Sequence, residues 1–336
     1  MSQTGRKPLR VLMVTSMYPS EHRPHYGTFI KSQVDSLEAA GVEVEIIHPE
    51  PGPRLLRYLW TIAHVWKKAR KKRFDLIHGH YGQWCLFARL QWAIPVVASF
   101  LGNDLLGKPL GNGRYSKYVA LNVRMSHWLC KHVDAVIVKS AQMKDETGIG
   151  DAFVIPNGVD FELFHPLPRA DTRAELGWDQ DRYYVLFGNN PDLPVKGFQR
   201  ARAAVEHLRT MGVSVELIVA NGLPQTKLVQ YINASNALIL PSLSEGSPNI
   251  VKESMACNVP VVATDVGDVV QVIGRTQGCS VCSPDPEDLA AGIEKALQHT
   301  GPTTGRTDIS HLESSVVAKQ VIAVYESVLR KRRRIS

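Results

Sequence analysis

The sequence predicts an α/β fold built from two doubly wound parallel sheets, and two observations carry that prediction. The chain has 336 residues, too many for one ordinary domain of ~100–200 residues and about right for two. Short apolar, β-rich runs alternate with helix-length amphipathic segments along almost the whole chain. This alternation is typical of βαβ units around a parallel sheet. We therefore expect two α/β domains that face each other across a cleft.

The first half of the chain contains the apolar runs of one sheet. Strands are expected at residues 10–15, 42–48, 75–78, 96–99, 135–139 and 153–155. Helices are expected between them, and the amphipathic stretch 55–66 is one of these. The first half therefore has the pattern of a Rossmann-like domain.

The second half repeats the pattern with its own strands and helices. Strands are expected at 183–187, 213–219, 237–240, 259–263 and 278–282, and helices near 197–210, 225–233, 248–256 and 286–298. This half also has the pattern of a doubly wound, Rossmann-like domain.

The boundary between the domains is expected in the segment 156–168, where proline and turn residues cluster and strand periodicity stops. We predict an N-terminal domain over 1–165 and a second domain over 166–309. The remaining 310–336 contains a helical pattern and ends in a basic tail. Because it follows the loop 300–305, this helix is expected to cross back to the first domain.

Composition excludes several classes of protein. With 44% hydrophobic and 21% charged residues and a mean hydropathy of -0.12, each half can bury a sizeable core, so disorder, collagen and a disulfide scaffold are excluded. The five scattered cysteines suit a reducing compartment. No apolar run approaches the ~20 residues of a membrane span, and the start of the chain lacks a cleavable signal pattern. We expect a cytoplasmic protein.

The net charge of +7 is concentrated in two places, Lys67–Arg73 and Arg330–Arg334. The first follows the amphipathic stretch 55–66, which is rich in leucine, tyrosine and tryptophan. Basic patches of this kind lie on anionic lipid, bind nucleic acid, or form solvated helix faces. No aromatic-rich recognition module accompanies the charge, so nucleic-acid binding ranks last. The first patch is a candidate contact with an anionic membrane surface.

The loop after the strand 237–240 carries the clearest chemistry, because ligands in open α/β sheets bind beyond the carboxyl ends of the strands. Ser247 is suited to cap the next helix and Pro248 to begin it, which would aim unpaired amides at an anion. Glu245 precedes this helix and Glu253 lies inside it. Two carboxylates beside an anion are suited to bind sugar diols, because two adjacent hydroxyls can donate hydrogen bonds to one carboxylate. The alternative is a helix-start charge and a solvated helix face.

In this setting of strand, Glu-Gly-Ser-Pro loop, helix and next strand, the sequence resembles the retaining family-4 glycosyltransferases of GT-B fold. Their signature is a Glu, seven residues and a second Glu. The segment 155–166 is similar to the family's interdomain segment, 187–198 to its phosphate-binding loop, and 75–80 to its first-domain strand and loop. The resemblance extends from Val11 to about Tyr325.

The resemblance implies a nucleotide-sugar donor held mainly by the second domain and an acceptor held mainly by the first. Glu253 would hold the ribose hydroxyls and Glu245 the hydroxyls of the donor sugar. Lys196 would neutralise the leaving diphosphate without a metal. The other donor-binding positions implied are Gly27, Thr28, Gly188, Asn189, Asn190, Gly246, Ser247, Pro248, Asn249, Ile250 and Val251. Gly27 would let the backbone approach the phosphate closely.

Two departures from the family pattern are visible. An arginine is usual shortly after the glycine of the phosphate loop, where this chain has Asn189 and Asn190. A His-Gly-x-Asp motif is common where this chain reads Leu101-Gly102-Asn103-Asp104. Asp104 is placed with Glu245 and Lys196 as a catalytic residue, and His80 and Asn103 on the acceptor side. His80 or His78 is the candidate substitute for the missing histidine.

The resemblance implies a metal-independent, retaining transferase of the hexosyltransferase type without a cofactor. It would move a sugar from a nucleotide-sugar, with UDP as the first choice of nucleotide, to a glycan or lipid-linked acceptor of polysaccharide or cell-envelope biosynthesis. The protein would be cytoplasmic and peripheral at the inner face of the membrane. A non-catalytic nucleotide-sugar binding protein and a nucleotide-sugar 2-epimerase remain the alternatives.

Overall fold

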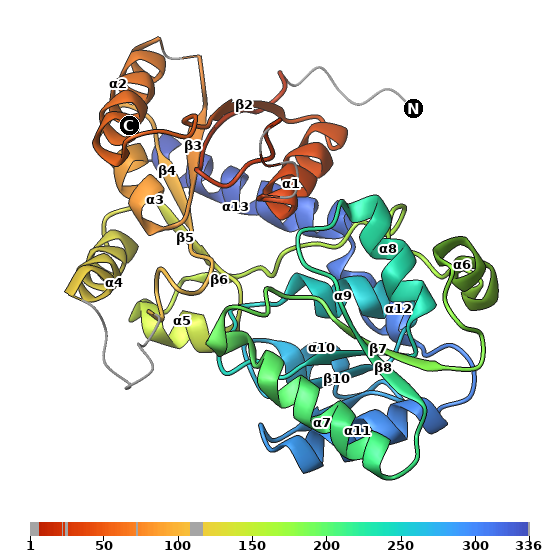
Figure 1. The fold of residues 1–336 in the computed structure, drawn as a ribbon. Helices are drawn as coiled ribbons and strands as arrows, with labels where there is room; N and C mark the ends of the chain where they lie inside the picture. The colour runs from red at the N-terminus through yellow and green to blue at the C-terminus, as the bar shows by residue number, and fades with distance from the viewer. Residues whose placement is uncertain (1–6, 22, 24–25, 72, 108–116, 335–336) are drawn as a thin grey trace. The chain divides into compact units, whose positions relative to one another are not determined.

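A computed structural model describes residues 7–21, 23, 26–71, 73–107 and 117–334 of the chain. The chain divides into two compact units (Figure 1). Unit 1 comprises residues 1–158 and 314–336, and unit 2 comprises residues 159–313.

The bounds of the units differ by a few residues from those expected at 165 and 309. The reason is that residues 159–164 and 310–313 belong together. The Val159 amide donates to the Leu312 carbonyl at 2.9 Å, and Phe164 is buried in a core of unit 2. The helix expected within 310–336 therefore begins only at Ser314, after a 3-10 turn (η2, Ser310–Leu312) in unit 2.

Unit 1 contains, within its described residues, a parallel sheet of six strands in the order β2-β1-β3-β4-β5-β6. The strands are β1 (Arg10–Val14), β2 (Glu43–Ile47), β3 (Leu76–His80), β4 (Val96–Ser99), β5 (Ala135–Val138) and β6 (Phe153–Val154). The helices are α1 (Thr28–Ala39), α2 (Arg54–Arg70), α3 (Gly82–Arg89), α4 (Lys117–Cys130), α5 (Ala141–Thr147) and α13 (Ser314–Arg333).

Both faces of this sheet are covered, which explains why β1 is apolar at successive positions. Val11 and Met13 pack with α1 and α13, whereas Leu12 and Val14 pack with α2 and α3. Successive strand residues point to opposite faces, so a strand with two covered faces is apolar throughout. Figure 1 shows α13 (blue) beside α1 (red), so a helix from the end of the sequence packs on a helix from its beginning. The final helix therefore belongs to the first unit.

Unit 2 contains, in the part of the chain that is described, a parallel sheet of five strands in the order β11-β10-β9-β7-β8. The strands are β7 (Tyr183–Phe187), β8 (Val215–Val219), β9 (Ala237–Leu240), β10 (Val261–Thr264) and β11 (Ser280–Cys282). The helices are α6 (Arg169–Leu176), α7 (Phe198–Thr210), α8 (Gln225–Ala234), α9 (Asn249–Ala256), α10 (Val269–Ile273), α11 (Pro286–Gln298) and α12 (Gly305–Asp308), with the 3-10 turn η1 (Pro194–Lys196).

The sheet of unit 2 is covered in the same way. One face packs on α8, α9 and α10, and the other on α7 and α11. The expected fold of two doubly wound α/β domains is confirmed. Because all strands are parallel, their carboxyl ends meet at one edge of each sheet, and the site residues are best described from those edges.

Candidate functional site

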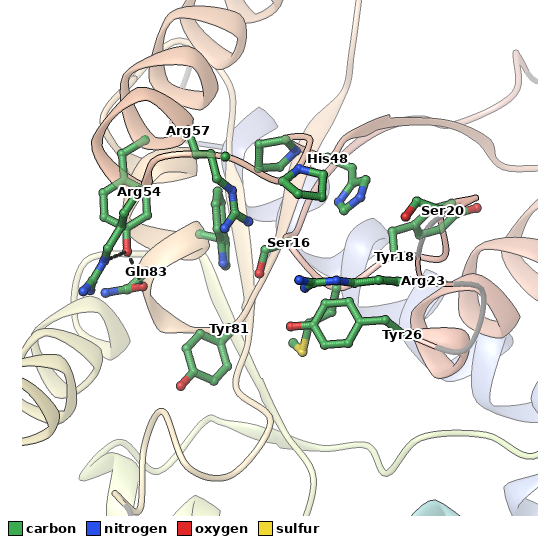
Figure 2. A pocket seen from close by; sticks show the side chains of 16 residues that line it. Ser16, Tyr18, Ser20, Arg23, Tyr26, His48, Arg54, Arg57, Tyr81 and Gln83 are labelled. Carbon is green, nitrogen blue, oxygen red and sulfur yellow. Dashed lines mark hydrogen bonds between the residues drawn. The ribbon is translucent and has the colours of Figure 1, made fainter. Parts of the chain in front are cut away.

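Unit 1 contains a cavity of about 520 Å³ next to the carboxyl ends of β1, β2 and β3 (Figure 2). Its walls come from the loops after β1 and β2, from the start of α3 and from one face of α2. The cavity could not be predicted from the sequence, because its walls come from segments far apart in the chain. The two arginines and the tyrosine within 54–58 were the only local signal for it.

Gly27 adopts a φ of 76°, and the structure gives a reason for a glycine that differs from the one expected. A Cβ at this position would lie 2.3 Å from the backbone carbon of Met17. The absence of a side chain therefore lets the start of α1 pack against the loop after β1. Thr28 is the first residue of α1.

Asp104 is buried, and all its hydrogen bonds that the structure shows go to backbone amides. One carboxylate oxygen accepts from the amides of Leu101 and Gly102, each at 2.9 Å, and the other from Gly82 at 3.0 Å. Burial raises the pKa of Asp104 to about 6, against the opposing effect of these hydrogen bonds. Asp104 thus ties the loop after β4 to the start of α3. The neighbouring Asn103 is exposed.

His80 ends β3 and is fully buried, with no hydrogen-bond partner for either ring nitrogen among the described residues. Burial lowers its pKa well below the usual value. Its neighbour His78 bonds to the Tyr325 hydroxyl at 2.6 Å and to the Ser99 hydroxyl at 2.8 Å, so it joins α13 to the sheet. The ring of His80 would therefore have to move before it could contact an acceptor substrate.

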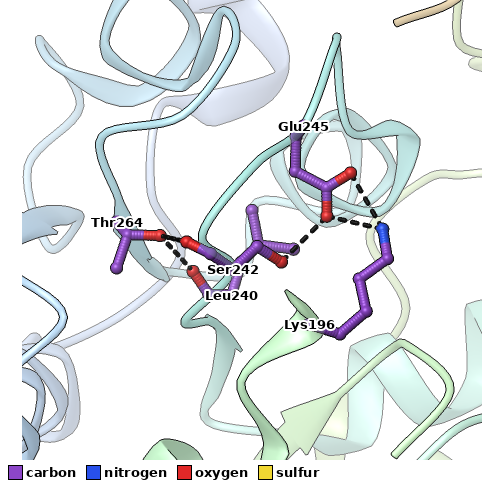
Figure 3. A network of polar contacts seen from close by, with 5 residues as sticks. All are labelled: Lys196, Leu240, Ser242, Glu245 and Thr264. Carbon is purple, nitrogen blue, oxygen red and sulfur yellow. Dashed lines mark hydrogen bonds and ion pairs between the residues drawn. The ribbon is translucent and has the colours of Figure 1, made fainter. Parts of the chain in front are cut away.

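Unit 2 brings Lys196 and Glu245 together at the carboxyl edge of its sheet (Figure 3). The ammonium of Lys196 donates to both carboxylate oxygens of Glu245, at 2.7 and 2.9 Å, and the Ser242 hydroxyl donates to one of them at 2.8 Å. The side chains are 22% and 12% exposed, so the pair is only partly screened by water. The strands β7 and β9 pair directly, which is why the loops that follow them meet.

Two hydrogen bonds to backbone carbonyls fix the loop of Glu245 in place. The Leu243 amide donates to the Val195 carbonyl at 2.8 Å, and the Thr264 hydroxyl, at the end of β10, donates to the carbonyl of Ser242. Gly197, directly after Lys196, has a φ of 74°, and a Cβ there would lie 2.1 Å from the Pro241 carbonyl oxygen. Glycine at this position therefore places Lys196 against the loop of Glu245.

We expect Gly197→Ala to lower the free energy of unfolding by more than the ~1–3 kcal/mol of a strained backbone, because a steric clash adds to it. Gly212→Ala is the matched control, since Gly212 has a φ of 86° and nothing within 4 Å of its missing Cβ. Urea denaturation of both variants measures the difference. Equal losses of stability would show that the Pro241 carbonyl does not require glycine at residue 197.

The start of α9 differs from the expected capping arrangement. The N-cap residue is Pro248, not Ser247, and no described side chain caps the helix. The Ser247 hydroxyl instead donates to Asp268 at 2.6 Å, and the buried Lys252 ammonium donates to Ser247 at 2.6 Å. Burial lowers the pKa of Lys252 and raises that of Asp268, and the attraction between them opposes both shifts. No described side chain therefore caps the N-terminal, positive end of the α9 dipole.

Neither Lys252 nor Asp268 was predicted from the sequence as a site residue. A lysine among the apolar residues of 250–256 was a usable signal for a buried cation. Nothing in the local sequence indicates that Asp268 reaches the same hydroxyl.

Glu253 lies in α9 and is half-buried. Burial raises the pKa of its carboxyl to about 7, and the neighbouring Lys252 opposes this shift. Within the described residues, no side chain or amide donates a hydrogen bond to its carboxylate. A desolvated carboxylate with unused acceptor capacity is suited to bind donors of a ligand.

The phosphate-loop residues also lie beside α9. A Cβ on Gly188 would lie 2.5 Å from a side-chain carbon of Ile250, so glycine allows this loop to contact the helix. The Asn190 side chain accepts from the Asp192 amide at 2.9 Å and closes a local turn. The Asn189 amide nitrogen is buried without a partner among the described residues, which leaves it as a donor for a ligand. Gly246 contacts the turn at Gly267.

No group of three or more histidine, cysteine, aspartate or glutamate residues suited to a metal ion occurs among the described residues. All five cysteines belong to that part of the chain and are free thiols in buried positions. A search of the same residues for a helix long and apolar enough to cross a membrane finds none.

Two family models match the chain. The model described as Glycosyltransferase Family 4 matches residues 6–163, and the model described as Glycosyl transferases group 1 matches residues 179–299. The matched ranges correspond closely to the two structural units.

Curated relatives share about a quarter of their residues with this chain. A Bacillus subtilis protein that carries the name teichuronic acid biosynthesis glycosyltransferase TuaC is 25% identical over 350 residues. The alignment covers 85% of this chain and 89% of that protein. A D-inositol 3-phosphate glycosyltransferase of Nocardiopsis dassonvillei is 27% identical over 67% of this chain and 62% of that protein. The chain therefore spans less than two thirds of this second relative.

Solved structures share the fold at lower identity. Sucrose-phosphate synthase from Thermosynechococcus elongatus superimposes with a TM-score of 0.76 at 21% identity, covering 97% of this chain and all of that one. Anabaena HepE in complex with UDP gives a TM-score of 0.68 at 18% identity, covering 95% of this chain and all of that one.

Proposed function

The chain belongs to the glycosyltransferases of group 1 and family 4 with a GT-B fold, and on this premise we propose a specific reaction. The protein is a retaining, metal-independent hexosyltransferase that moves a sugar from a UDP-sugar to a glycan or lipid-linked acceptor of the cell envelope. The observation that carries the proposal is the Lys196–Glu245 pair at the carboxyl edge of the second sheet, beside the uncapped start of α9. Titration with UDP, GDP and ADP tests the choice of donor.

The donor would replace the contact between the two paired side chains. Lys196 turns from the Glu245 carboxylate to the diphosphate, while Glu245 accepts hydroxyls of the donor sugar. Glu253 accepts the two hydroxyls of the ribose, and the α9 terminus faces the phosphates. This arrangement supplies positive charge from Lys196 and a helix dipole, so the proposal needs no metal ion.

The reaction needs no protein nucleophile. The bond from the anomeric carbon to the diphosphate oxygen breaks, and a bond to the acceptor hydroxyl oxygen forms on the same face of the sugar. The proton of that hydroxyl passes to a leaving phosphate oxygen. The residues of unit 2 contribute by orienting the donor and by stabilising the charge that develops on the diphosphate.

The acceptor domain of this proposal is unit 1, and α2 supports a membrane-borne acceptor. Leu55, Leu56 and Leu59 are 68%, 62% and 56% exposed on one stripe of this helix. Of the expected basic patch Lys67–Arg73, Lys72 lies outside the described residues, and the exposed members include Lys67 and Lys71. An apolar stripe followed by cations suits the surface of an anionic membrane. The TuaC relative, named for teichuronic acid biosynthesis, supports a cell-envelope acceptor.

We expect the protein to sediment with vesicles that contain phosphatidylglycerol and not with vesicles of phosphatidylcholine alone. The double change Leu55→Glu, Leu59→Glu should weaken this binding at least about tenfold, because two leucines no longer enter the lipid. Leu121→Glu is the control, since Leu121 is 65% exposed on α4. Binding that is equal in the double variant and the wild type would rule out α2 as the membrane contact.

A further inference from the structure

The cavity of unit 1 has a positively charged lining. Within the described part of the chain, Arg23, Arg54 and Arg57 line it, and no aspartate or glutamate does. Burial lowers the pKa of His48, which also lines the cavity, so the positive charge comes from the arginines. Figure 2 shows the guanidinium groups of Arg23 and Arg57 turned toward the middle of the cavity, where Ser16 lies. A cavity with cations and without carboxylates favours an anionic occupant.

The arginines differ in how they are used within the protein. Arg54 donates to the Tyr58 hydroxyl at 2.6 Å and stacks on the Tyr118 ring at 4.1 Å, so its position is already held. By contrast, the Nε atom of Arg57 is buried without a hydrogen-bond partner among the described residues. A buried charged donor without a partner is costly, and an oxyanion from a ligand would satisfy it. Arg57 is therefore the side chain that most clearly lacks a ligand.

Two further features of the wall point the same way. The cavity adjoins the start of α2, whose first turn contains no acidic residue and whose N-cap, Pro53, provides no side-chain cap. This positive end of a helix dipole adds to the charge of the arginines. Tyr81 lines the cavity, and its backbone has a φ of 74°, a conformation that residues other than glycine rarely adopt. Such strain is typical of side chains that are positioned for a ligand.

The size and the aromatic content of the cavity indicate that the anion is carried by a larger group. A volume of about 520 Å³ exceeds the needs of a single phosphate or carboxylate. Tyr18, Tyr26 and Trp84 offer rings and polar edges in the same lining, which suits a sugar ring with apolar faces and hydroxyl edges.

We propose that this cavity binds the acceptor through a sugar that carries an oxyanion, either a phosphate or a carboxylate, held by Arg57 and Arg23. The inference rests on the proposed glycosyltransferase function and adds the charge of the acceptor. Two sources share this chemistry: a sugar phosphate, as in a lipid-linked acceptor, and a uronate in a glycan. The planar guanidinium of arginine matches both groups with paired hydrogen bonds.

The experiment is a calorimetric titration of the whole protein with glucose 1-phosphate, glucuronate and glucose. We expect at least one of the anionic sugars to bind, and glucose to bind at least about tenfold more weakly. Arg57→Gln should weaken binding of the anionic sugar by about ten- to a hundredfold, whereas Arg124→Gln, an exposed change on α4, should leave it unchanged. Which anionic sugar binds tells the two sources apart.

Several results would overturn the proposal. These are equal affinity for glucose and the anionic sugars, no binding of any of the three, and unchanged anion binding in Arg57→Gln. If circular dichroism shows that Arg57→Gln does not fold, Arg57→Lys takes its place, because lysine keeps the charge but loses the paired hydrogen bonds. Arg57→Lys should then weaken binding of the anionic sugar, but by less than the roughly ten- to a hundredfold expected for Arg57→Gln.

A parallel titration with UDP separates this proposal from the proposed function. The Arg57→Gln variant should bind UDP like the wild type, because the side chains proposed to hold the donor, Lys196, Glu245 and Glu253, belong to unit 2. A wild-type protein that binds UDP but no anionic sugar would contradict the acceptor proposal alone. A protein that binds anionic sugars but no nucleotide would contradict the donor assignment alone.

Discussion

Lys196→Ala is expected to lower the rate of sugar transfer by about 10²- to 10³-fold, as loss of one preorganised charge-stabilising group does in other enzymes. Lys196 ends η1 and lies 2.7 Å from a Glu245 oxygen, so its ammonium is already held in the proposed donor site. Without it, the charge on the leaving diphosphate would lose the cation that we propose stabilises it. The measurement is the rate of UDP release from a UDP-sugar, with and without acceptor.

Two further variants sharpen this test. Lys295→Ala removes an exposed lysine of α11 and should leave the rate unchanged. Lys196→Arg should retain part of the rate, because arginine keeps the charge but presents it as a planar fork and not as a point. A Lys196→Ala enzyme as fast as the wild type would remove Lys196 from the catalytic residues.

Glu253→Gln is expected to weaken UDP binding by about ten- to a hundredfold, because hydrogen bonds to an ionised acceptor are lost. The same assignment predicts a pH dependence. Burial raises the pKa of Glu253 to about 7, so its carboxylate ionises as the pH rises through that value. UDP affinity of the wild type should therefore increase from pH 6 to pH 8, while that of the variant should stay nearly constant. Calorimetry at both pH values measures this.

The free energy of unfolding of the wild type should change with pH in the opposite direction to its UDP affinity. The pKa of Glu253 is about 7 in the folded protein against 4.5 for an ordinary glutamate, so the folded state binds more protons between these values. The free energy of unfolding therefore falls as the pH rises from about 4.5 to about 7. Above that range the wild type carries a charge that folding removes in part from water, so Glu253→Gln should be the more stable protein at pH 8. The difference should vanish near pH 4.

The matched control is Glu206→Gln on α7, where the carboxylate is 63% exposed and pairs with Arg209 at 3.3 Å. An exposed pair of this kind contributes little, so the control should match the wild type in both measurements. Urea denaturation at pH 4 and pH 8 provides the stabilities. A Glu253→Gln protein that binds UDP normally at both pH values would contradict the ribose assignment, whatever its stability.

Much of the fold could be predicted because its signals are local. The apolar runs of β1, β7 and β9 mark strands with two covered faces, and the predicted helix at 286–298 coincides with α11, where Asp285 caps and Pro286 begins the helix. Differences at other ends amount to a few residues, as at 75–78 for β3 (Leu76–His80). A difference of four residues, at the start of α13 (Ser314), arose because Leu312 and Glu313 contact Val159, about 150 positions earlier.

The candidate site could be predicted only in part, for the same reason. Glu245 and Lys196 were identified as separate residues, but the order of the strands decides that their loops meet. The Ser247 cap was predicted from neighbouring residues, and it is wrong because Asp268 and Lys252 engage its hydroxyl. His80 was placed on the acceptor side, and the packing around it leaves its ring fully buried.

The sequence by itself determined the two α/β units, the positions of their strands and most of the residues of the proposed donor site. Period-2 and period-3.6 patterns and capping residues act over a few positions, so they can be recognised without a structure. The sequence also predicted that the last helix crosses back to the first domain, and this is confirmed. Only the tertiary structure decided that Lys196 pairs with Glu245, and that arginines from the loop after β1 and from α2 share a cavity. These contacts depend on the order of strands in each sheet, which joins residues far apart in the chain.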